Sequence, residues 1–206
     1  MNDNSSEVSI TVLLPAGRLP LDIMKATHEL AEKYQFGIYF SLAQNMRLIN
    51  VPESAIERVN KTLTALGADF KSPGKFPLPR ICIGKPHCDL GLVDTEQLSQ
   101  KILARFGERQ NTKAKLKISI AGCTIGCPWP QNTDISITAT RRGYTICAGG
   151  KGGMVPRVAR RIKREATEPE VLDTIATLVD FHDRKTKTKR QLYQLLEDPE
   201  FPFPAV

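Results

Sequence analysis

The chain has 206 residues, of which 41% are hydrophobic, and its formal net charge is +7. This length accommodates one ordinary domain or two small ones, and the composition is normal for a protein that buries a core. The longest apolar runs are short, like that at 12–14, which excludes a membrane span, and the polar start of the chain does not resemble a secretory signal. We therefore expect a cytoplasmic protein with no membrane partner.

The positive charge is compatible with a solvated surface, nucleic acid, an acidic protein partner or an anionic ligand. The sequence contains no RNA-binding or zinc-finger motif, so nucleic acid is not expected as a partner. The basic run at 182–191 is interpreted as a solvated surface, with docking of an acidic protein as the alternative.

Residues 7–70 have the pattern of a small α+β layer. Apolar alternation predicts a strand at 8–12, and segments 37–41 and 47–51, rich in β-branched and aromatic residues, predict two more. A helix with Gly67 as its stop is predicted from Ile56, Val59, Leu63 and Leu66, and an earlier one from Leu21, Met24, Leu30, Ala31 and Tyr34. The order β-α-β-β-α predicts helices on one face of a sheet.

Segment 71–79, KSPGKFPLP, holds three prolines and a glycine and predicts a linker or an extended crossover. We therefore divide the chain into domains at 1–75 and 76–206. In the second, Asp94 is predicted to cap a helix, and strands are predicted at 116–120, 134–139 and 144–148.

The end of the second domain is predicted to contain a flexible loop at 148–153 and two helices. The first helix places inward the apolar residues Val171, Leu172, Ile175, Leu178 and Val179. The second lies around Leu192, Leu195 and Leu196.

Four of the five cysteines form two pairs in loops rich in glycine and proline. Cys82 and Cys88 are spaced C-x5-C, and Cys123 and Cys127 are spaced C-x3-C. Two such loops brought together by a sheet favour an Fe–S cluster, which takes four thiolates. Zinc, disulfides and unrelated buried cysteines are alternatives, although structural zinc prefers C-x2-4-C and disulfides are rare without export. Cys147 lies within a predicted strand and is expected to pack in the core.

These segments resemble the siroheme- and [4Fe-4S]-dependent sulfite and nitrite reductases. The matching pieces are CIGKPHC at 82–88, AGCTIGC at 121–127, DISI at 134–137 and YTICAGG at 144–150. The resemblance implies an α+β fold, in which a ferredoxin-like half-domain is followed by a siroheme- and [4Fe-4S]-binding α+β domain. Because the unit is found once, the chain is most similar to the small, single-repeat, assimilatory-type sulfite reductases.

The resemblance also implies the ligands of the two cofactors. A [4Fe-4S] cluster would be bound by Cys82, Cys88, Cys123 and Cys127, and Cys127 would also be the axial thiolate of the siroheme iron. Gly149 and Gly150 would lie against the macrocycle, because they have no side chains to prevent close approach.

Basic side chains are implied around siroheme and its substrate, because siroheme is edged with carboxylates and the substrate is an anion. Gln44 and Arg47 are the candidates for the cofactor, and Arg80, Lys115 and Lys117 are those for the substrate. Alternation along a strand would place both lysines on one face.

Two residues depart from the family pattern: Ala43 stands where an arginine is common, and Ile125 where an asparagine is usual. The implied function is reduction of sulfite to sulfide, with electrons from a ferredoxin-like or other acidic donor protein. Nitrite reduction by the same apparatus, or electron transfer by a [4Fe-4S] protein without siroheme, are the alternatives.

Overall fold

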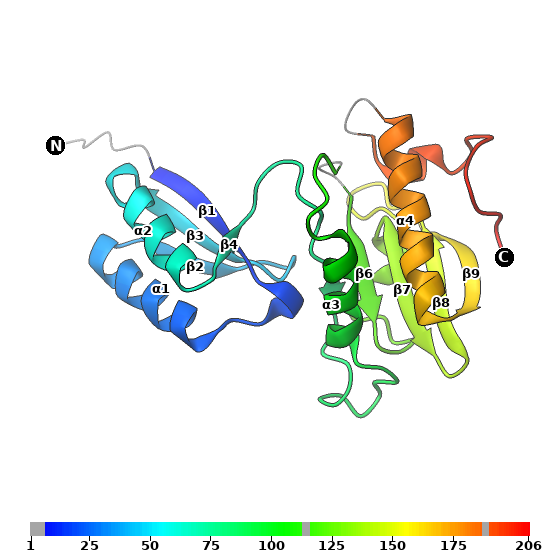
Figure 1. Cartoon of the computed structure of the whole chain (residues 1–206), viewed down its shortest axis with the longest axis horizontal. Coiled ribbons are helices and arrows are strands. Elements are labelled where there is room, and N and C mark those ends of the chain that lie inside the picture. Colours follow the sequence, from blue (N-terminus) through cyan, green and yellow to red (C-terminus); the bar gives the residue numbers. More distant parts are fainter. Residues whose placement is uncertain (1–6, 113–115, 187–189) are drawn as a thin grey trace. The chain divides into compact units, whose positions relative to one another are not determined.

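The computed structural model describes residues 7–112, 116–186 and 190–206. The chain divides into two compact units, Met1–Ser72 and Pro73–Val206. The first unit is built on a four-stranded sheet and the second on a five-stranded sheet (Figure 1). Over the described ranges, none of the helices combines the length and the apolar character needed to cross a membrane.

The first unit alternates strands and helices in the order βαββαβ. Its elements are β1 (Glu7–Leu13), α1 (Leu21–Tyr34), β2 (Gly37–Phe40), β3 (Met46–Pro52), α2 (Glu53–Ala65) and β4 (Asp69–Phe70), with a short 3-10 turn η1 (Pro15–Gly17) after β1. The sheet is antiparallel in the order β2-β3-β1-β4, which is the ferredoxin-like arrangement. Both helices lie on the same face of this sheet (Figure 1). The predicted elements are confirmed, and β4 completes the sheet.

The core of the first unit lies between this sheet and its two helices. From α1 it receives Ile23, Thr27 and Leu30. Leu21 and Met24, from which this helix was predicted, do not reach the core, since they are 74% and 50% exposed. The buried positions follow an i, i+4, i+7 stripe, in which the Thr27 methyl takes the place of an aliphatic side chain.

The second unit contains the five-stranded sheet and two long helices. In chain order its elements are β5 (Arg80–Ile81), α3 (Thr95–Phe106), β6 (Ile118–Ala121), η2 (Pro130–Asn132), β7 (Ile135–Thr140), β8 (Gly143–Ala148), β9 (Arg160–Ala166), α4 (Glu168–Lys185) and η3 (Leu192–Leu195). The strand order is β5-β6-β7-β8-β9. Strands β5, β6 and β7 are parallel, whereas β7, β8 and β9 are antiparallel.

Helices α3 and α4 lie side by side against the sheet (Figure 1). Lys101 of α3 pairs with Glu168 of α4 at 2.6 Å, and Arg105 pairs with Asp173 at 2.8 Å. Such exposed pairs contribute about 0.2–1 kcal/mol each, so the apolar faces of the helices provide most of the stabilisation. The predicted cap is present, because Oδ1 of Asp94 accepts a hydrogen bond from the Gln97 amide at 3.0 Å.

The C-terminal part departs from the predictions in two places. The run at 182–191 does not begin as a solvated surface, because His182 at the end of α4 is buried and Lys185 pairs with Asp198 at 3.0 Å; residues 187–189 of the run lie outside the described residues. The last predicted helix is only the 3-10 turn η3, which buries Leu192 and Leu195.

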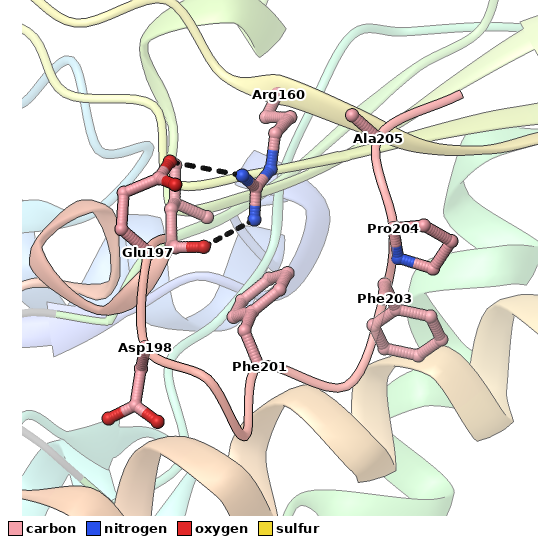
Figure 2. Close-up of a pocket in the computed structure, with 8 residues that line it drawn as sticks. Arg160, Glu197, Asp198, Phe201, Phe203, Pro204 and Ala205 are labelled. Carbon is pink, nitrogen blue, oxygen red and sulfur yellow. Dashed lines mark hydrogen bonds and ion pairs between the residues drawn. The ribbon is translucent and has the colours of Figure 1, made fainter.

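After η3 the chain loops away, and its last residue returns to the start of β9, where the Val206 amide donates to the Arg161 carbonyl at 3.1 Å. This segment lines a shallow cavity of about 200 Å³ around the Arg160 guanidinium. Figure 2 shows Arg160 beside Glu197 and above the ring of Phe201. Its Nη1 lies 3.1 Å from Oε1 of Glu197, and its Cζ lies 4.9 Å from the centre of the Phe201 ring. The predicted site residues that the structure describes do not line this cavity, and we interpret the segment as cover for the edge of the sheet.

Candidate iron–sulfur site

The two cysteine loops leave neighbouring parallel strands at the same edge of the second sheet. Cys82 directly follows β5, and Cys123 follows β6 after one glycine. Ile81 is in register with Ile120, so strands β5 and β6 end together at the carboxyl-terminal edge. The topology thereby brings the C-x5-C and C-x3-C loops to one place, as an iron–sulfur centre requires.

Backbone hydrogen bonds join the two loops. The Leu92 amide of the first loop donates to the Gly122 carbonyl of the second at 2.8 Å. In the other direction, the Gly122 amide donates to Sγ of Cys82 at 3.1 Å. These protein–protein hydrogen bonds therefore hold Cys82 beside the loop that carries Cys123 and Cys127.

The remaining cysteines lie further along these loops. Cys88 is half-buried, and its carbonyl accepts a hydrogen bond from the Gly91 amide at 2.9 Å. Cys127 has an exposed side chain, whereas Cys123 is half-buried. Cys127 precedes Pro128, in the crossover that returns from the end of β6 to the start of β7.

The residues at this edge fit a [4Fe-4S] cluster by their chemistry. Four thiols are available on two loops, and an amide donor already points at one sulfur. In the part of the chain that the structure describes, no three His, Cys, Asp or Glu side chains are grouped as ligands of a metal ion. A four-iron cluster is larger than one ion and takes one thiolate per iron.

Apolar side chains are exposed on the same two loops. They are Ile83, Leu90, Leu92, Ile125 and Trp129, which are between 38% and 68% exposed. A flat, largely apolar macrocycle such as that of siroheme would cover side chains of this kind. This part of the unit therefore fits a macrocycle beside the exposed Cys127.

Cys147 lies apart from the two loops, on β8. Its register partner on β7 is Ser136, and burial raises the pKa of its thiol. A half-buried thiol within a strand agrees with the packing role predicted for it.

Two of the predicted basic residues lie at the starts of parallel strands in the second unit. Lys117 immediately precedes β6 and has an exposed side chain. Arg80 is half-buried on β5, and its Nη2 donates to Oγ1 of Thr133 at 3.2 Å. Burial lowers the pKa of Arg80, and the nearby Asp134 acts in the opposite direction. Lys115 lies outside the described residues.

Asp134 is a buried carboxyl that the sequence analysis did not single out. It is 1% exposed, and its Oδ2 accepts a hydrogen bond from the Lys117 amide at 3.1 Å. Burial raises its pKa to about 6, although the Leu192 amide and the charge of Lys117 act to lower it. Asp134 opens the predicted strand at 134–139 and the DISI segment, but neither pattern marks it as a buried carboxyl.

Gly149 and Gly150 are tightly packed against the protein itself. The Gly149 amide donates to the Asp134 carbonyl at 2.7 Å. A Cβ on Gly149 would lie 2.5 Å from Leu196, and one on Gly150 would lie 2.6 Å from backbone atoms of Gln131 and Thr133. The loop at 148–153 is therefore not flexible at its start. This packing alone explains both glycines, and their contact with siroheme stays a prediction.

Lys117 and the second cysteine loop thus mark the two ends of β6. Ile135 is in register with Ile118 and Ala148, so Lys117 and Gly149 share the amino-terminal edge of β6 and β7. Lys117 and Gly122 are five positions apart, a span of roughly 16 Å at 3.3 Å per residue. A small anion held near the cysteine loops could therefore reach Lys117 only through the length of the lysine side chain and of a large cofactor that spans much of the gap.

Gln44 and Arg47 belong to the first unit. Gln44 lies in the turn between β2 and β3, where its amide donates to the Ser41 carbonyl at 2.9 Å. Arg47 is exposed on β3 between Thr11 and Tyr39 of the neighbouring strands. Their contact with a cofactor held by the second unit remains a prediction.

Comparison with known protein families gives two matches that together cover most of the chain. The model described as the nitrite and sulphite reductase 4Fe-4S domain matches residues 78–199. The model described as the nitrite/sulfite reductase ferredoxin-like half domain matches residues 1–66. Both parts of the predicted architecture are therefore confirmed.

Some relatives are named nitrite reductases and others sulfite reductases, and both kinds are similar to much of this chain. A nitrite reductase [NAD(P)H] of Emericella nidulans is 23% identical over 91% of this chain, and an assimilatory-type sulfite reductase of Nitratidesulfovibrio vulgaris is 23% identical over 89%. The chain spans 17% of the length of the former and 84% of the latter. A coenzyme F420-dependent sulfite reductase of Methanocaldococcus jannaschii is 32% identical over 62% of this chain, which spans 20% of that protein.

Solved structures share the fold at low sequence identity. The NirA protein of Mycobacterium tuberculosis matches 94% of this chain with a TM-score of 0.74 and 18% identity, and the match covers 40% of that protein. A dissimilatory sulfite reductase I matches 90% of this chain with a TM-score of 0.73 and 12% identity, and the match covers 65% of that chain.

Proposed function

Because the chain belongs to the nitrite and sulphite reductase family, we propose that it carries a [4Fe-4S] cluster and siroheme and reduces sulfite to sulfide. The observation that carries this proposal is the meeting of the two cysteine loops at the carboxyl-terminal edge of β5 and β6. Family membership makes the cluster the expected occupant of that edge, in preference to zinc or disulfides.

Each paired cysteine has a defined part in this proposal. The thiolates of Cys82, Cys88, Cys123 and Cys127 hold the cluster, and the exposed Cys127 also ligates the siroheme iron. The apolar side chains on the two loops exclude water from the macrocycle. When bound, these cofactors supply one-electron transfer and an iron site for the substrate.

Basic residues have the second part, which is to attract the anion and neutralise its oxygens. Lys117 is exposed and available for this, together with Lys115. The Arg80 guanidinium donates to Thr133 and lies near Asp134, so its contribution is a positive field at the site in addition to any contact with substrate. Gln44 and Arg47 of the first unit are proposed to contact the cofactor.

Sulfite is favoured over nitrite by one relative of similar size. The assimilatory-type sulfite reductase is matched over 84% of its length, whereas this chain spans only 17% of the Emericella nitrite reductase. Nitrite is the second candidate, because nitrite reductases are similar to this chain at the same level of identity. Electrons would come from a ferredoxin-like or other acidic protein, which the net charge of +7 would attract.

The decisive experiment is purification without oxygen, followed by iron and sulfide analysis and acid–acetone extraction. We expect four irons and four acid-labile sulfides in the cluster, and an extract containing an iron isobacteriochlorin. Turnover with reduced methyl viologen is then measured for sulfite and nitrite separately. A colourless extract from protein that retains its cluster would leave an electron carrier, and faster turnover of nitrite would reverse the choice of substrate.

A further inference from the structure

The hydrogen bonding between β5 and β6 departs from a regular ladder at Cys82. The Cys82 amide donates to the Ile120 carbonyl at 3.2 Å, as a parallel ladder requires. The next bond of that ladder would run from the Gly122 amide to the Cys82 carbonyl. Instead, the Gly122 amide donates to the Cys82 sulfur at 3.1 Å.

The Cys82 carbonyl has a different partner, the side chain of Thr95. The Thr95 hydroxyl donates to this carbonyl at 2.6 Å, and the residue is completely buried. Thr95 is the first residue of α3, directly after its cap Asp94. The cap and the helix fix the position of the hydroxyl, and the hydroxyl satisfies the carbonyl that the ladder leaves open.

Glycines on both cysteine loops make room for Thr95. A Cβ on Gly84 would lie 2.6 Å from the Thr95 hydroxyl, and a Cβ on Gly122 would lie 3.1 Å from the Thr95 methyl and 3.3 Å from the Cys82 sulfur. Thr95 is therefore packed between the two loops, and its side chain has little freedom to move away from the carbonyl.

We propose that Thr95 is a positioning residue for the iron–sulfur cluster. Because the Thr95 hydroxyl donates to the Cys82 carbonyl, the Gly122 amide is left to donate to the Cys82 sulfur. The inference rests on the proposed function, because it takes Cys82 as a cluster ligand. A reduced cluster carries one more negative charge, and an amide hydrogen at a ligand sulfur stabilises that charge. Thr95 thereby raises the reduction potential of the cluster and favours its acceptance of electrons.

The test compares the reduction potential of the cluster in variants of Thr95. Thr95→Val keeps the shape of the side chain and removes the hydroxyl, so the Gly122 amide is expected to turn to the vacant Cys82 carbonyl. The cluster potential should then shift to a more negative value. Thr95→Ser keeps the hydroxyl and should keep the wild-type potential. Potentials are measured on the cluster-loaded full chain by redox titration followed by electron paramagnetic resonance.

Thr174 provides a matched control. It is also buried, and its hydroxyl donates to the Glu170 carbonyl at the same distance of 2.6 Å, within α4. Thr174→Val therefore removes an equivalent hydrogen bond and should lower the free energy of unfolding without a shift in potential. A fully loaded Thr95→Val protein with the wild-type potential would overturn the inference.

Failure of Thr95→Val to load its cluster is covered by a second comparison. If Thr95→Val and Thr95→Ala both lose iron while Thr95→Ser and Thr174→Val keep it, the hydroxyl is required at Cys82 and the positioning role is supported. If Thr95→Ser loses as much iron as the other two, the role of the hydroxyl is rejected. A wild-type chain without any cluster would reject the proposed function itself.

Discussion

The Lys117 amide donates a hydrogen bond to the Asp134 carboxyl at 3.1 Å, and this carboxyl is almost completely buried. The bond joins the start of β6 to the start of β7. Two positive charges face Asp134, from Lys117 beside it and from Arg80 on β5. Burial nevertheless dominates, and the pKa of Asp134 rises from 3.8 to about 6.

Asp134→Asn should make the stability of the second unit less dependent on pH. Because the folded-state pKa of Asp134 lies above its ordinary value, protonation stabilises the fold fully below about pH 4, and this contribution is lost as the pH rises through about 6. Asparagine accepts the same amide bond and has no charge to bury. As the pH rises from 4 to 7, the free energy of unfolding of the variant should therefore increase by up to about 3 kcal/mol relative to that of the wild type.

Urea unfolding of the full chain, followed by fluorescence of its single tryptophan, Trp129, measures this difference. Asp173→Asn is a suitable control, since this carboxylate is exposed and pairs across the surface with Arg105. A constant difference between wild type and Asp134→Asn across the pH range would contradict a raised pKa.

Cys123→Ser should abolish iron and sulfide loading, whereas Cys147→Ser should leave both intact. Cys123 follows β6 at the edge where the two loops meet, and Cys147 lies within β8 with Ser136 as its register partner. Serine is a poor ligand for a cluster but replaces a packed thiol with little change in volume. Iron and acid-labile sulfide per chain are the measurement, and equal losses in the two variants would refute the ligand assignment.

Gly150→Ala should destabilise the second unit whether or not a cofactor is bound. The new methyl group would lie 2.6 Å from backbone atoms of Gln131 and Thr133, which cannot move independently. We expect a loss of about 1–3 kcal/mol or more in the free energy of unfolding. Gly152→Ala is the control, since a Cβ there meets only the Asn132 side chain, at 3.9 Å. If Gly150→Ala kept its stability but lost siroheme, the glycine would serve the cofactor.

The sequence was sufficient to predict most elements and the grouping of the paired cysteines, because both depend on local patterns. It was not sufficient for β9, whose sequence RRIKREA buries only Ile162 and Ala166. A mostly charged strand is typical of a protected sheet edge and has no clear apolar alternation. His182 was similarly assigned to the surface because of its charged neighbours, although α4 places it on the buried face.

The candidate site was predicted only as far as cysteine spacing and family resemblance allow. Thr95 was not found because a threonine after a capping residue is an ordinary way to begin a helix. Its contact with the Cys82 carbonyl depends on the packing of α3 against β5, which joins residues 13 positions apart. The glycines at 149 and 150 were interpreted through the cofactor, because their close contacts with Leu196 and Thr133 arise only in the folded unit.

Replacement of Lys115 and Lys117 together by alanine should raise the apparent KM for sulfite and lower turnover, while the cluster and its spectrum remain. Each lost hydrogen bond to a charged group would cost about 1.5–3 kcal/mol, which corresponds to roughly 10- to 150-fold in kcat/KM. The prediction is demanding for Lys117, because this residue lies roughly 16 Å from Gly122 along β6 and so far from the second cysteine loop.

A control that removes the same charge elsewhere combines Lys101→Ala and Lys163→Ala, two lysines in surface ion pairs with Glu168 and Glu170. Kinetics with reduced methyl viologen as donor compare the two double variants. If the two double variants lose the same factor in kcat/KM, Lys115 and Lys117 act only through their charge. The anion would then bind near the carboxyl-terminal edge, where the exposed Arg141 in the β7–β8 turn is the next residue to replace.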